Sequence, residues 1–243
     1  MIRVAVVDCG TNTFNLLIAE ADAGGWKKIF RSKLPVKLGA GGFAAGNITS
    51  SRFIRGIDAL YCHHQNIINF DCRHTIAVGT SALREATNAK EFLTYAQRVA
   101  RLDVEVISGE REASLIYKGV TQTITPSEIP VLVMDIGGGS TEFIIGNKDG
   151  ILWSKSFLLG VSRLQEMLTP SERFSHRDAS QIRQALGAAL PELNAALKEF
   201  QPAVLIGSSG SFDTLLSLYR YNKKMTEPVA LANEIPMSEL PAI

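Results

Sequence analysis

Two short runs of apolar residues along the chain each lead into an aspartate, a glycine turn and a second apolar run. The first run is Val4–Val7, followed by Asp8, and the second is Val131–Met134, followed by Asp135. An unbroken apolar run of this length is typical of a strand that is buried on both faces. Each pattern therefore predicts a pair of strands joined by a turn that begins with a carboxylate.

The two patterns match position by position when their aspartates are superposed, 127 positions apart (8 and 135). Gly10 then falls on Gly137, and Thr13 falls on Ser140. Glycines at a turn let the backbone adopt unusual conformations and leave its N–H groups free to converge on an anion. The repetition predicts two similar lobes that each present a phosphate-binding turn to a shared cleft.

Strands and helices alternate over the rest of the chain, which predicts an α/β fold. We expect a strand pair over 26–37 and strands over 74–79, 102–107, 151–158 and 203–206. We expect helices over 50–68, from 81, over 108–120, from about 160 to before Pro170, and over 178–200 with a bend at Pro191. Pro126 and Pro130 mark a linker, so we predict lobes at 1–122 and 123–243. The tail from residue 221 has no clear final element, and the second lobe looks incomplete at its C-terminus.

The composition is that of an ordinary soluble protein, with 46% hydrophobic and 20% charged residues in 243. We identify no signal peptide and no apolar run near the roughly 20 residues that span a bilayer, so we expect a cytoplasmic protein without a membrane partner. Cys9, Cys62 and Cys72 lack the spacing of a disulfide framework or a zinc site. The net charge of +1 argues against a nucleic-acid partner that covers the whole surface.

Two further segments bear on anion binding. The section with five cations has two interpretations, a sheet edge protected by lysines or an anion-attracting rim, and both stay open. These cations are Lys27, Lys28, Arg31, Lys33 and Lys37. The glycine-rich segment 38–46 lacks the GK[ST] ending of a P-loop, so we expect a mobile connection without chemistry.

Two charged side chains at expected helix starts are candidates for chemistry. Arg84 follows a strand and lies in a first helical turn. Its guanidinium could bind a phosphate through two hydrogen bonds or pair with Glu85. Glu112 lies on the flank of an apolar helical stripe, where a carboxylate usually has a partner or a task. The alternative for Glu112 is a helix-start carboxylate that interacts with the dipole.

Together these motifs resemble the Ppx/GppA family of exopolyphosphatases and guanosine pentaphosphate phosphohydrolases, within the actin, Hsp70 and sugar-kinase fold. The resemblance covers nearly the whole chain. The matching segments are Val7–Phe14, Thr80–Arg84, Ile107–Tyr117, Met134–Glu142 and Gly207–Ser211. The segment Ile107–Tyr117 is the specific one, since kinases and chaperones of this fold lack it. The resemblance implies two actin/Hsp70-like (ribonuclease H-like) lobes, each a mixed sheet with helices, around a central cleft.

The resemblance also implies a role for each motif residue. Glu112 would activate water, and Arg84 would hold the terminal phosphate. The phosphate chain would bind Gly10, Thr11, Asn12, Thr13, Gly137, Gly138, Gly139, Ser140, Thr141, Gly207, Ser208 and Gly210. Asp8, Asp135 and Glu142 would position a Mg²⁺ ion. Arg111 departs from relatives that often carry a second acid there, and this puts any function that needs that acid in doubt.

We therefore expect an enzyme, a Mg²⁺-assisted hydrolase that removes the terminal phosphate of polyphosphate or guanosine pentaphosphate by in-line attack of water. Two alternatives stay open. One is a phosphotransfer kinase of the same fold, and the other is a non-catalytic sensor that binds an alarmone or polyphosphate. A homodimer is compatible with this reading, although no residue decides the oligomeric state.

Overall fold

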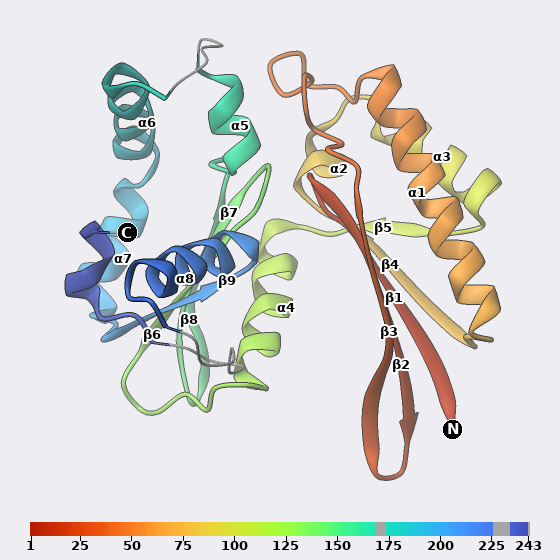
Figure 1. Cartoon of the computed structure of the whole chain (residues 1–243), viewed down its shortest axis with the longest axis horizontal. Helices are drawn as coiled ribbons and strands as arrows, with labels where there is room; N and C mark the ends of the chain where they lie inside the picture. The colour runs from red at the N-terminus through yellow and green to blue at the C-terminus, as the bar shows by residue number, and fades with distance from the viewer. Residues whose placement is uncertain (169–173, 226–233, 243) are drawn as a thin grey trace. The chain divides into compact units, whose positions relative to one another are not determined.

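The computed structural model describes residues 1–168, 174–225 and 234–242. They form two compact units (Figure 1), which we call unit 1 and unit 2. Unit 1 comprises Met1–Gly109, Gly138–Ser140 and Leu158–Ile182, and unit 2 comprises Glu110–Gly137, Thr141–Phe157 and Arg183–Ile243. The predicted α/β class with a mixed sheet in each of two lobes is confirmed. The boundary predicted between residues 122 and 123 stays a prediction.

Unit 1 contains a five-stranded sheet in the order β3-β2-β1-β4-β5. The strands are β1 (Ile2–Cys9), β2 (Thr13–Asp22), β3 (Gly25–Pro35), β4 (His74–Gly79) and β5 (Val104–Val106). The first three form an antiparallel meander, whereas β4 pairs parallel to β1 and β5 parallel to β4. The apolar run Val4–Val7 thus occupies the centre of the sheet, but the predicted burial on both faces is wrong, because Ala5 and Val7 are fully buried on one face whereas Val6 on the other is 37% exposed.

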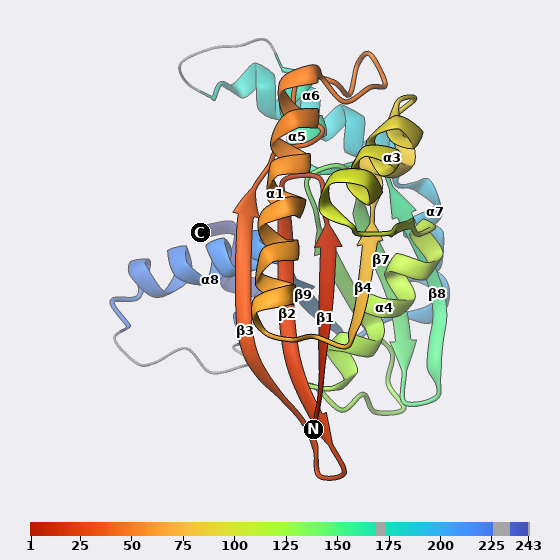
Figure 2. The ribbon, with the colours of Figure 1, turned by 90° about the vertical axis from the view of Figure 1, so that its right-hand side faces the viewer.

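The long helices α1 (Ser50–Asn69) and α3 (Ala89–Ala100) are amphipathic and contribute buried side chains to the core of unit 1. Figure 2 shows α1 lying along the sheet. Phe92 of α3 is fully buried and meets Phe14 of β2 edge to face, with ring centroids 6.4 Å apart. His63 of α1 is also buried, and its Nε2 lies 3.1 Å from the carbonyl oxygen of Phe14.

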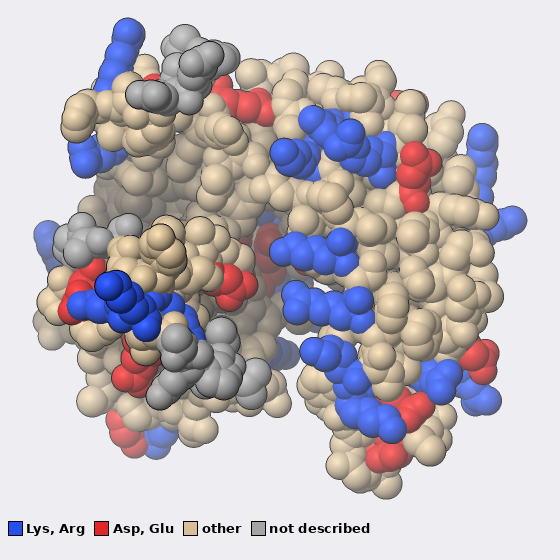
Figure 3. All heavy atoms as spheres, in the orientation of Figure 1, with Lys and Arg blue, Asp and Glu red and all other residues tan. Residues whose placement is uncertain are grey.

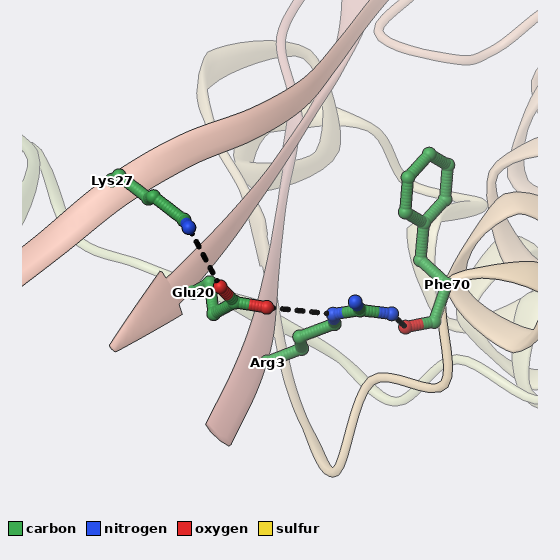
Figure 4. Close-up of polar contacts among 4 residues, drawn as sticks. All are labelled: Arg3, Glu20, Lys27 and Phe70. Carbon is green, nitrogen blue, oxygen red and sulfur yellow. Dashed lines mark hydrogen bonds and ion pairs between the residues drawn. The ribbon is translucent and has the colours of Figure 1, made fainter. Parts of the chain in front are cut away.

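Ion pairs between side chains connect β1, β2 and β3 at the end of the meander away from the first turn (Figure 4). Glu20 receives the Arg3 guanidinium at 3.1 Å and the Lys27 ammonium at 3.0 Å. Arg3 also donates to the carbonyl oxygen of Phe70 at 2.9 Å. The contacts link β1, β2 and β3 with the end of α1, and the two cations lower the pKa of Glu20.

Unit 2 contains a four-stranded sheet in the order β8-β7-β6-β9. Its strands are β6 (Val131–Ile136), β7 (Thr141–Asn147), β8 (Gly150–Phe157) and β9 (Val204–Ser208). Its helices are α4 (Gly109–Thr121), α7 (Pro191–Phe200) and α8 (Gly210–Asn222), with the 3₁₀ helix η1 (Met237–Ala242) near the end. Its core joins Ala113 and Tyr117 of α4 to the sheet residues Val133 and Ile144.

The two sheets repeat one topology. In each, three antiparallel strands are followed by a strand parallel to the first, so that β3-β2-β1-β4 corresponds to β8-β7-β6-β9. Asp8 pairs with Asn15, and Asp135 pairs with Glu142, seven positions later in both hairpins. A register shift follows Ile18 in one sheet and Ile145 in the other, again 127 positions apart. The repeat inferred from the sequence is therefore a structural repeat.

Two elements differ from their predictions. The segment 26–37 is not a strand pair: its residues up to Pro35 belong to one long strand, β3, which pairs with β2 over its full length. The expected helix 178–200 is two helices, α6 (His176–Ala189) and α7, since Pro191 cannot continue a helix and instead begins one. None of the helices in the described ranges has the length and apolarity needed to cross a membrane.

Candidate phosphate-binding site

The first turn, between β1 and β2, is closed by backbone hydrogen bonds of unit 1. The N–H of Gly10 donates to the carbonyl oxygen of Thr13 at 3.1 Å. The carbonyl oxygen of Asn12 accepts from the N–H of Val36 at 2.9 Å and from that of Lys37 at 2.8 Å. The end of β3 therefore supports the turn from outside and fixes its shape.

The carboxylate that opens this turn is held by the facing strand. Asp8 and Asn15 form a cross-strand pair, and Asn15 Nδ2 donates to Asp8 Oδ2 at 3.0 Å. The amide satisfies one carboxylate oxygen without neutralising its charge. Asp8 thus stays an acceptor at the end of β1.

The glycines of the second turn pack against the first turn. A Cβ added to Gly138 would lie 2.7 Å from the Asn12 side chain, and one added to Gly139 would lie 2.7 Å from Thr11 Oγ1 and 2.6 Å from Ser81 Oγ. Real Cβ atoms do not approach other atoms so closely. The missing side chains of these glycines therefore let residues 138–140 pack closely against the first turn within unit 1, and a larger residue would displace the side chains around them.

Hydroxyl groups gather around the two turns. Thr11, Ser81 and Ser140 are all at most 5% exposed. The Oγ of Ser81 is buried and has no hydrogen-bond partner among the described residues. Burying a hydroxyl group without a hydrogen-bond partner destabilises the folded state. Ser81 Oγ can therefore donate a hydrogen bond to a ligand that binds between the turns.

The short helix α5 (Val161–Glu166) contacts both turns, a role that its sequence did not predict. Ser162 Oγ donates to Asn12 Oδ1 of the first turn at 2.8 Å, and the Ser162 N–H donates to the carbonyl oxygen of Gly138 at 2.9 Å. One residue thus bridges the two turns. The only sequence signal was a glycine shortly after a strand with Ser162 two positions later, a pattern too common to single it out.

Arg163 adds a second set of contacts from α5. Its Nε donates to the carbonyl oxygen of Gly139 at 3.0 Å, and its guanidinium lies over the Phe43 ring, 4.5 Å from the centroid. Burial lowers the pKa of Arg163, while Glu85 and Glu166 oppose that change. Its buried Nη2 has no hydrogen-bond partner in the described part of the chain. Arg163 therefore places positive charge directly beside the second turn.

The glycine-rich segment 38–46, expected to be a mobile connection, has packing partners in unit 1. Leu38 is fully buried. The N–H of Gly41 donates to the Glu166 carboxylate, and the carbonyl oxygen of Gly46 accepts from Thr87 Oγ1 at 3.1 Å. Through Phe43 the segment also covers the guanidinium of Arg163, so it supports the site although it contains no P-loop motif.

In unit 2 the equivalent hairpin carries two carboxylates instead of one. Asp135 and Glu142 are a cross-strand pair, and like charges directly opposite one another repel. Burial raises the pKa of Asp135, and hydrogen bonds from Ser209 and Ser208 act in the opposite direction. Glu142 is 2% exposed and accepts from Ser156 Oγ at 2.7 Å.

The predicted late glycine turn lies at the end of β9, close to this carboxylate pair. Ser208 pairs with Asp135 across the parallel strands. Ser209 has a positive φ of 78°, and Ser209 Oγ and Ser211 Oγ donate to the carbonyl oxygen of Ile136 at 3.0 and 3.2 Å. Serine in that conformation is unusual. Ser209 and Ser211 were not among the predicted site residues, although they stand within the predicted turn.

Arg84 and Glu112 both lie in the expected elements. Arg84 lies in the last turn of the short helix α2 (Ser81–Glu85). Its Nη1 donates to the carbonyl oxygen of Ile107 at 2.9 Å, and its Nε lies 3.8 Å from Glu85 Oε1. Glu112 is half-buried in the first turn of α4. Arg84 belongs to unit 1 and Glu112 to unit 2, so a common ligand for the two remains a prediction.

Comparison with known proteins adds to this geometry. The sequence model of the Ppx/GppA phosphatase family matches residues 17–242, which is most of the chain. The chain belongs to the Ppx/GppA phosphatase family. The resemblance drawn from the motifs is thereby confirmed. The matched range begins after the first turn, so the assignment of that turn rests on the structural repeat.

Named members of the Ppx/GppA family are moderately similar to this chain. A guanosine-5'-triphosphate,3'-diphosphate pyrophosphatase of Aeromonas hydrophila is 32% identical over 216 residues, covering 87% of this chain and 42% of the relative. A putative exopolyphosphatase of Haemophilus influenzae is 30% identical over 220 residues, covering 90% and 68%. The chain thus spans about two fifths of the first relative's length and about two thirds of the second's.

Solved structures of the Ppx/GppA family share the fold. The crystal structure of an exopolyphosphatase from Cytophaga hutchinsonii has a TM-score of 0.89 and 37% identity, covering 94% of this chain and 73% of the other. The Aquifex aeolicus PPX-GPPA enzyme has a TM-score of 0.71 and 28% identity, covering 93% and 74%. These matches agree with the two-sheet architecture.

The Ppx/GppA resemblance implies Mg²⁺, and the carboxylates present suit that ion. Mg²⁺ in phosphoryl-transfer sites is commonly held by one or two carboxylates together with substrate phosphates and water. Asp135 and Glu142 face each other on one hairpin, and a cation would relieve their repulsion. Among the described residues no group of three or more His, Cys, Asp or Glu side chains could hold a metal ion by itself. The ligand set Asp8, Asp135 and Glu142 stays a prediction.

Proposed function

We propose that the chain hydrolyses the terminal phosphoanhydride bond of polyphosphate or guanosine pentaphosphate. The observation that carries the proposal is the pair of turns packed together in unit 1. Gly138 and Gly139 lie against Asn12 and Thr11, and α5 fastens both turns. Adjacent glycine turns present many backbone N–H groups to a chain of phosphates.

In this proposal the turns bind and orient the phosphate chain. Backbone N–H groups of residues 11–13 and 138–140 donate to the non-bridging oxygens, and Ser81 Oγ supplies a donor that has no other partner among the described residues. The Arg163 guanidinium adds positive charge next to Gly139. Fixed donors of this kind stabilise charge that develops on the transferred phosphoryl group.

Glu112 is the proposed general base and Arg84 the proposed ligand of the terminal phosphate. A half-buried carboxylate can accept the proton of an attacking water if its environment favours the neutral form. Mg²⁺ would neutralise phosphate charge when it is held by Asp135 and Glu142, with Asp8 as a further ligand. Gly207, Ser208 and Gly210 would complete the binding surface in unit 2 near Asp135.

The test is phosphate release from tripolyphosphate, long-chain polyphosphate and guanosine pentaphosphate in the presence of Mg²⁺. Glu112→Gln removes the base but keeps the size of the side chain, so release should fall by about 100-fold or more while phosphate-chain affinity stays close to that of the unmodified protein. Glu110→Gln is the matched control, because Glu110 stands in the same first turn of α4 and is exposed.

Three results would contradict parts of the proposal. Near-normal release by Glu112→Gln would exclude Glu112 as the base. Transfer of phosphate to an acceptor instead of water would indicate a kinase of the same fold. Tight binding of guanosine pentaphosphate without release from any substrate would indicate a sensor.

A further inference from the structure

One face of the unit 1 sheet carries a row of cations along β3. Figure 3 shows a line of Lys and Arg side chains over the part of unit 1 where the meander lies in Figure 1. On β3 these are Lys28, Arg31 and Lys33, all exposed. The opposite face of the same strands contributes Phe14, Leu16 and Ile18 to the buried core. The row therefore lies on the face that the core does not use.

The strand register explains how three unevenly spaced residues share one face. Side chains alternate along a strand, so Arg31 and Lys33 point the same way and Lys28 would not. The register shift at Ile18/Ala19 adds one residue to β3 and brings Lys28 into phase. The successive pairs on this face are Ala19 with Lys28, Leu17 with Arg31, Asn15 with Lys33 and Thr13 with Pro35.

The row leads to the first phosphate turn. Thr13, a predicted phosphate-binding residue, is the next position on this face after Asn15. Ala19 lies six positions from Thr13 along β2, which corresponds to roughly 20 Å of strand. Lys37 follows on the same stretch of chain, and its N–H donates to the carbonyl oxygen of Asn12 in the turn. An extended ligand that ends at the turn can therefore contact the row.

The carboxylate that shares the face of this row is Asp8 of β1, which pairs with Asn15 at the turn end of the row and accepts from its amide. The residues of β2 opposite the three cations are Asn15, Leu17 and Ala19, which carry no charge. Lys27, on the other face, pairs instead with Glu20 at 3.0 Å (Figure 4). Within the described residues, Lys28, Arg31 and Lys33 take part in no ion pair, so they can attract an external anion.

We propose that Lys28, Arg31 and Lys33 bind the body of a linear polyphosphate whose terminal phosphate occupies the turns. The proposal rests on the phosphoanhydride hydrolysis proposed above and selects a polymeric substrate over guanosine pentaphosphate. A polyphosphate chain has a negative charge at every unit and no base. It needs a row of cations along its length, which this face supplies.

Two different roles for these cations fit the row less well. Lysines on an edge strand hinder edge-to-edge pairing, but that role does not require a shared face or a path to the turn. Single-stranded nucleic acid would need successive aromatic side chains on which bases stack. Trp26, 68% exposed, is the one large aromatic that the described strand β3 adds to this face, and it stands at the far end of the row.

The test is equilibrium binding of tripolyphosphate and long-chain polyphosphate to the whole chain at several salt concentrations. In the variant Lys28→Gln/Arg31→Gln/Lys33→Gln the loss of affinity should grow with chain length. With about 0.7 counterions released per contact on a single-stranded polyanion, the slope of log K against log salt should shrink by about 2. Over a fourfold rise in salt, the unmodified protein should then lose roughly 20-fold more affinity than the variant.

Two controls separate the row from general charge and from misfolding. Arg55→Gln/Arg73→Gln/Lys90→Gln removes three exposed cations elsewhere in unit 1 and should leave the slope unchanged. Lys28→Arg/Arg31→Lys/Lys33→Arg keeps the charge and should retain the binding. Both variants and the triple Gln variant should unfold at urea concentrations similar to the unmodified protein.

An unchanged slope in the triple Gln variant would overturn the proposal, as would an equal change in the Arg55/Arg73/Lys90 control. Single-stranded DNA bound as tightly as polyphosphate, and weakened as much by the variant, would show a nucleic-acid surface instead. If no substrate releases phosphate, the proposed hydrolysis fails, yet the binding slopes still decide whether this row holds a polyanion.

Discussion

Replacing Gly160 by alanine should disable the second turn while leaving the rest of unit 1 folded. Gly160 precedes α5, with φ −74° and ψ 155°, a conformation open to any residue. The added Cβ would nevertheless lie less than 3.0 Å from the carbonyl carbon and oxygen of Gly138 and from the nitrogen of Gly139. These are backbone atoms of the turn, so no side-chain rotation relieves the clash.

The size of the effect follows from the distance that must be made up. An ordinary carbon contact is about 3.5 Å, so the turn or α5 must move by roughly 1 Å. A misplacement of about 1 Å in a catalytic site costs on the order of 100-fold in rate. Overpacking of a filled site also costs about 1–3 kcal/mol of unfolding free energy, which a protein of ordinary stability tolerates.

Phosphate release from tripolyphosphate gives the rate, and urea denaturation gives the stability. Gly187→Ala is the matched control, because Gly187 lies in α6 with nothing within 4 Å of an added Cβ. That substitution should raise the unfolding free energy by about 0.5–1 kcal/mol and leave release unchanged. A Gly160→Ala protein that releases phosphate within about twofold of the normal rate would refute the reasoning.

Three other predictions concern unit 1. Ser162→Ala should lower the unfolding free energy by about 1 kcal/mol. A double-mutant cycle with Asn12→Ala, measured by urea denaturation, should give a coupling energy of similar size. Additive losses would show that the hydrogen bond between Ser162 and Asn12 does not contribute to stability. Burial lowers the pKa of His63 below its ordinary 6.5, so protons bind the unfolded state preferentially below about pH 6.5 and stability should fall from there toward pH 5. Urea midpoints of His63→Gln should show a smaller decline over that range, and an identical decline would assign it to other groups. Phe92→Ala should lower the unfolding free energy by about 3–5 kcal/mol. A thermal scan that shows a loss below 1 kcal/mol would mean that the surrounding side chains fill the space left by the ring.

The sequence predicted most of the fold because hydrophobic runs and glycine turns are local signals. The repeat between Asp8 and Asp135 predicted two similar sheets, and strand pairing and register bear this out. Errors arose where a local pattern had two solutions. No residue in 26–37 distinguished one long strand from two short ones, and only the pairing with β2 over its full length decided it.

The site was only partly predictable for a related reason. The glycine turns have a composition that identifies them, whereas Ser162 and Arg163 act through contacts with residues more than 20 positions away. Nothing in the order of residues 160–166 indicates which carbonyl groups they meet. Phe43 is a similar case, since its contact with the Arg163 guanidinium depends on how the segment 38–46 folds back.

The assignment of residues 138–140 to unit 1 has a practical consequence for anyone who wishes to produce one half of this protein. Unit 1 is assembled from three separate stretches of chain, and unit 2 is interrupted in the same places. No cut at a single codon therefore separates the two units: even a cut after residue 182, which leaves unit 1 complete, removes two of the three stretches of unit 2 from the other fragment, so that fragment should not accumulate as a folded product when expressed alone.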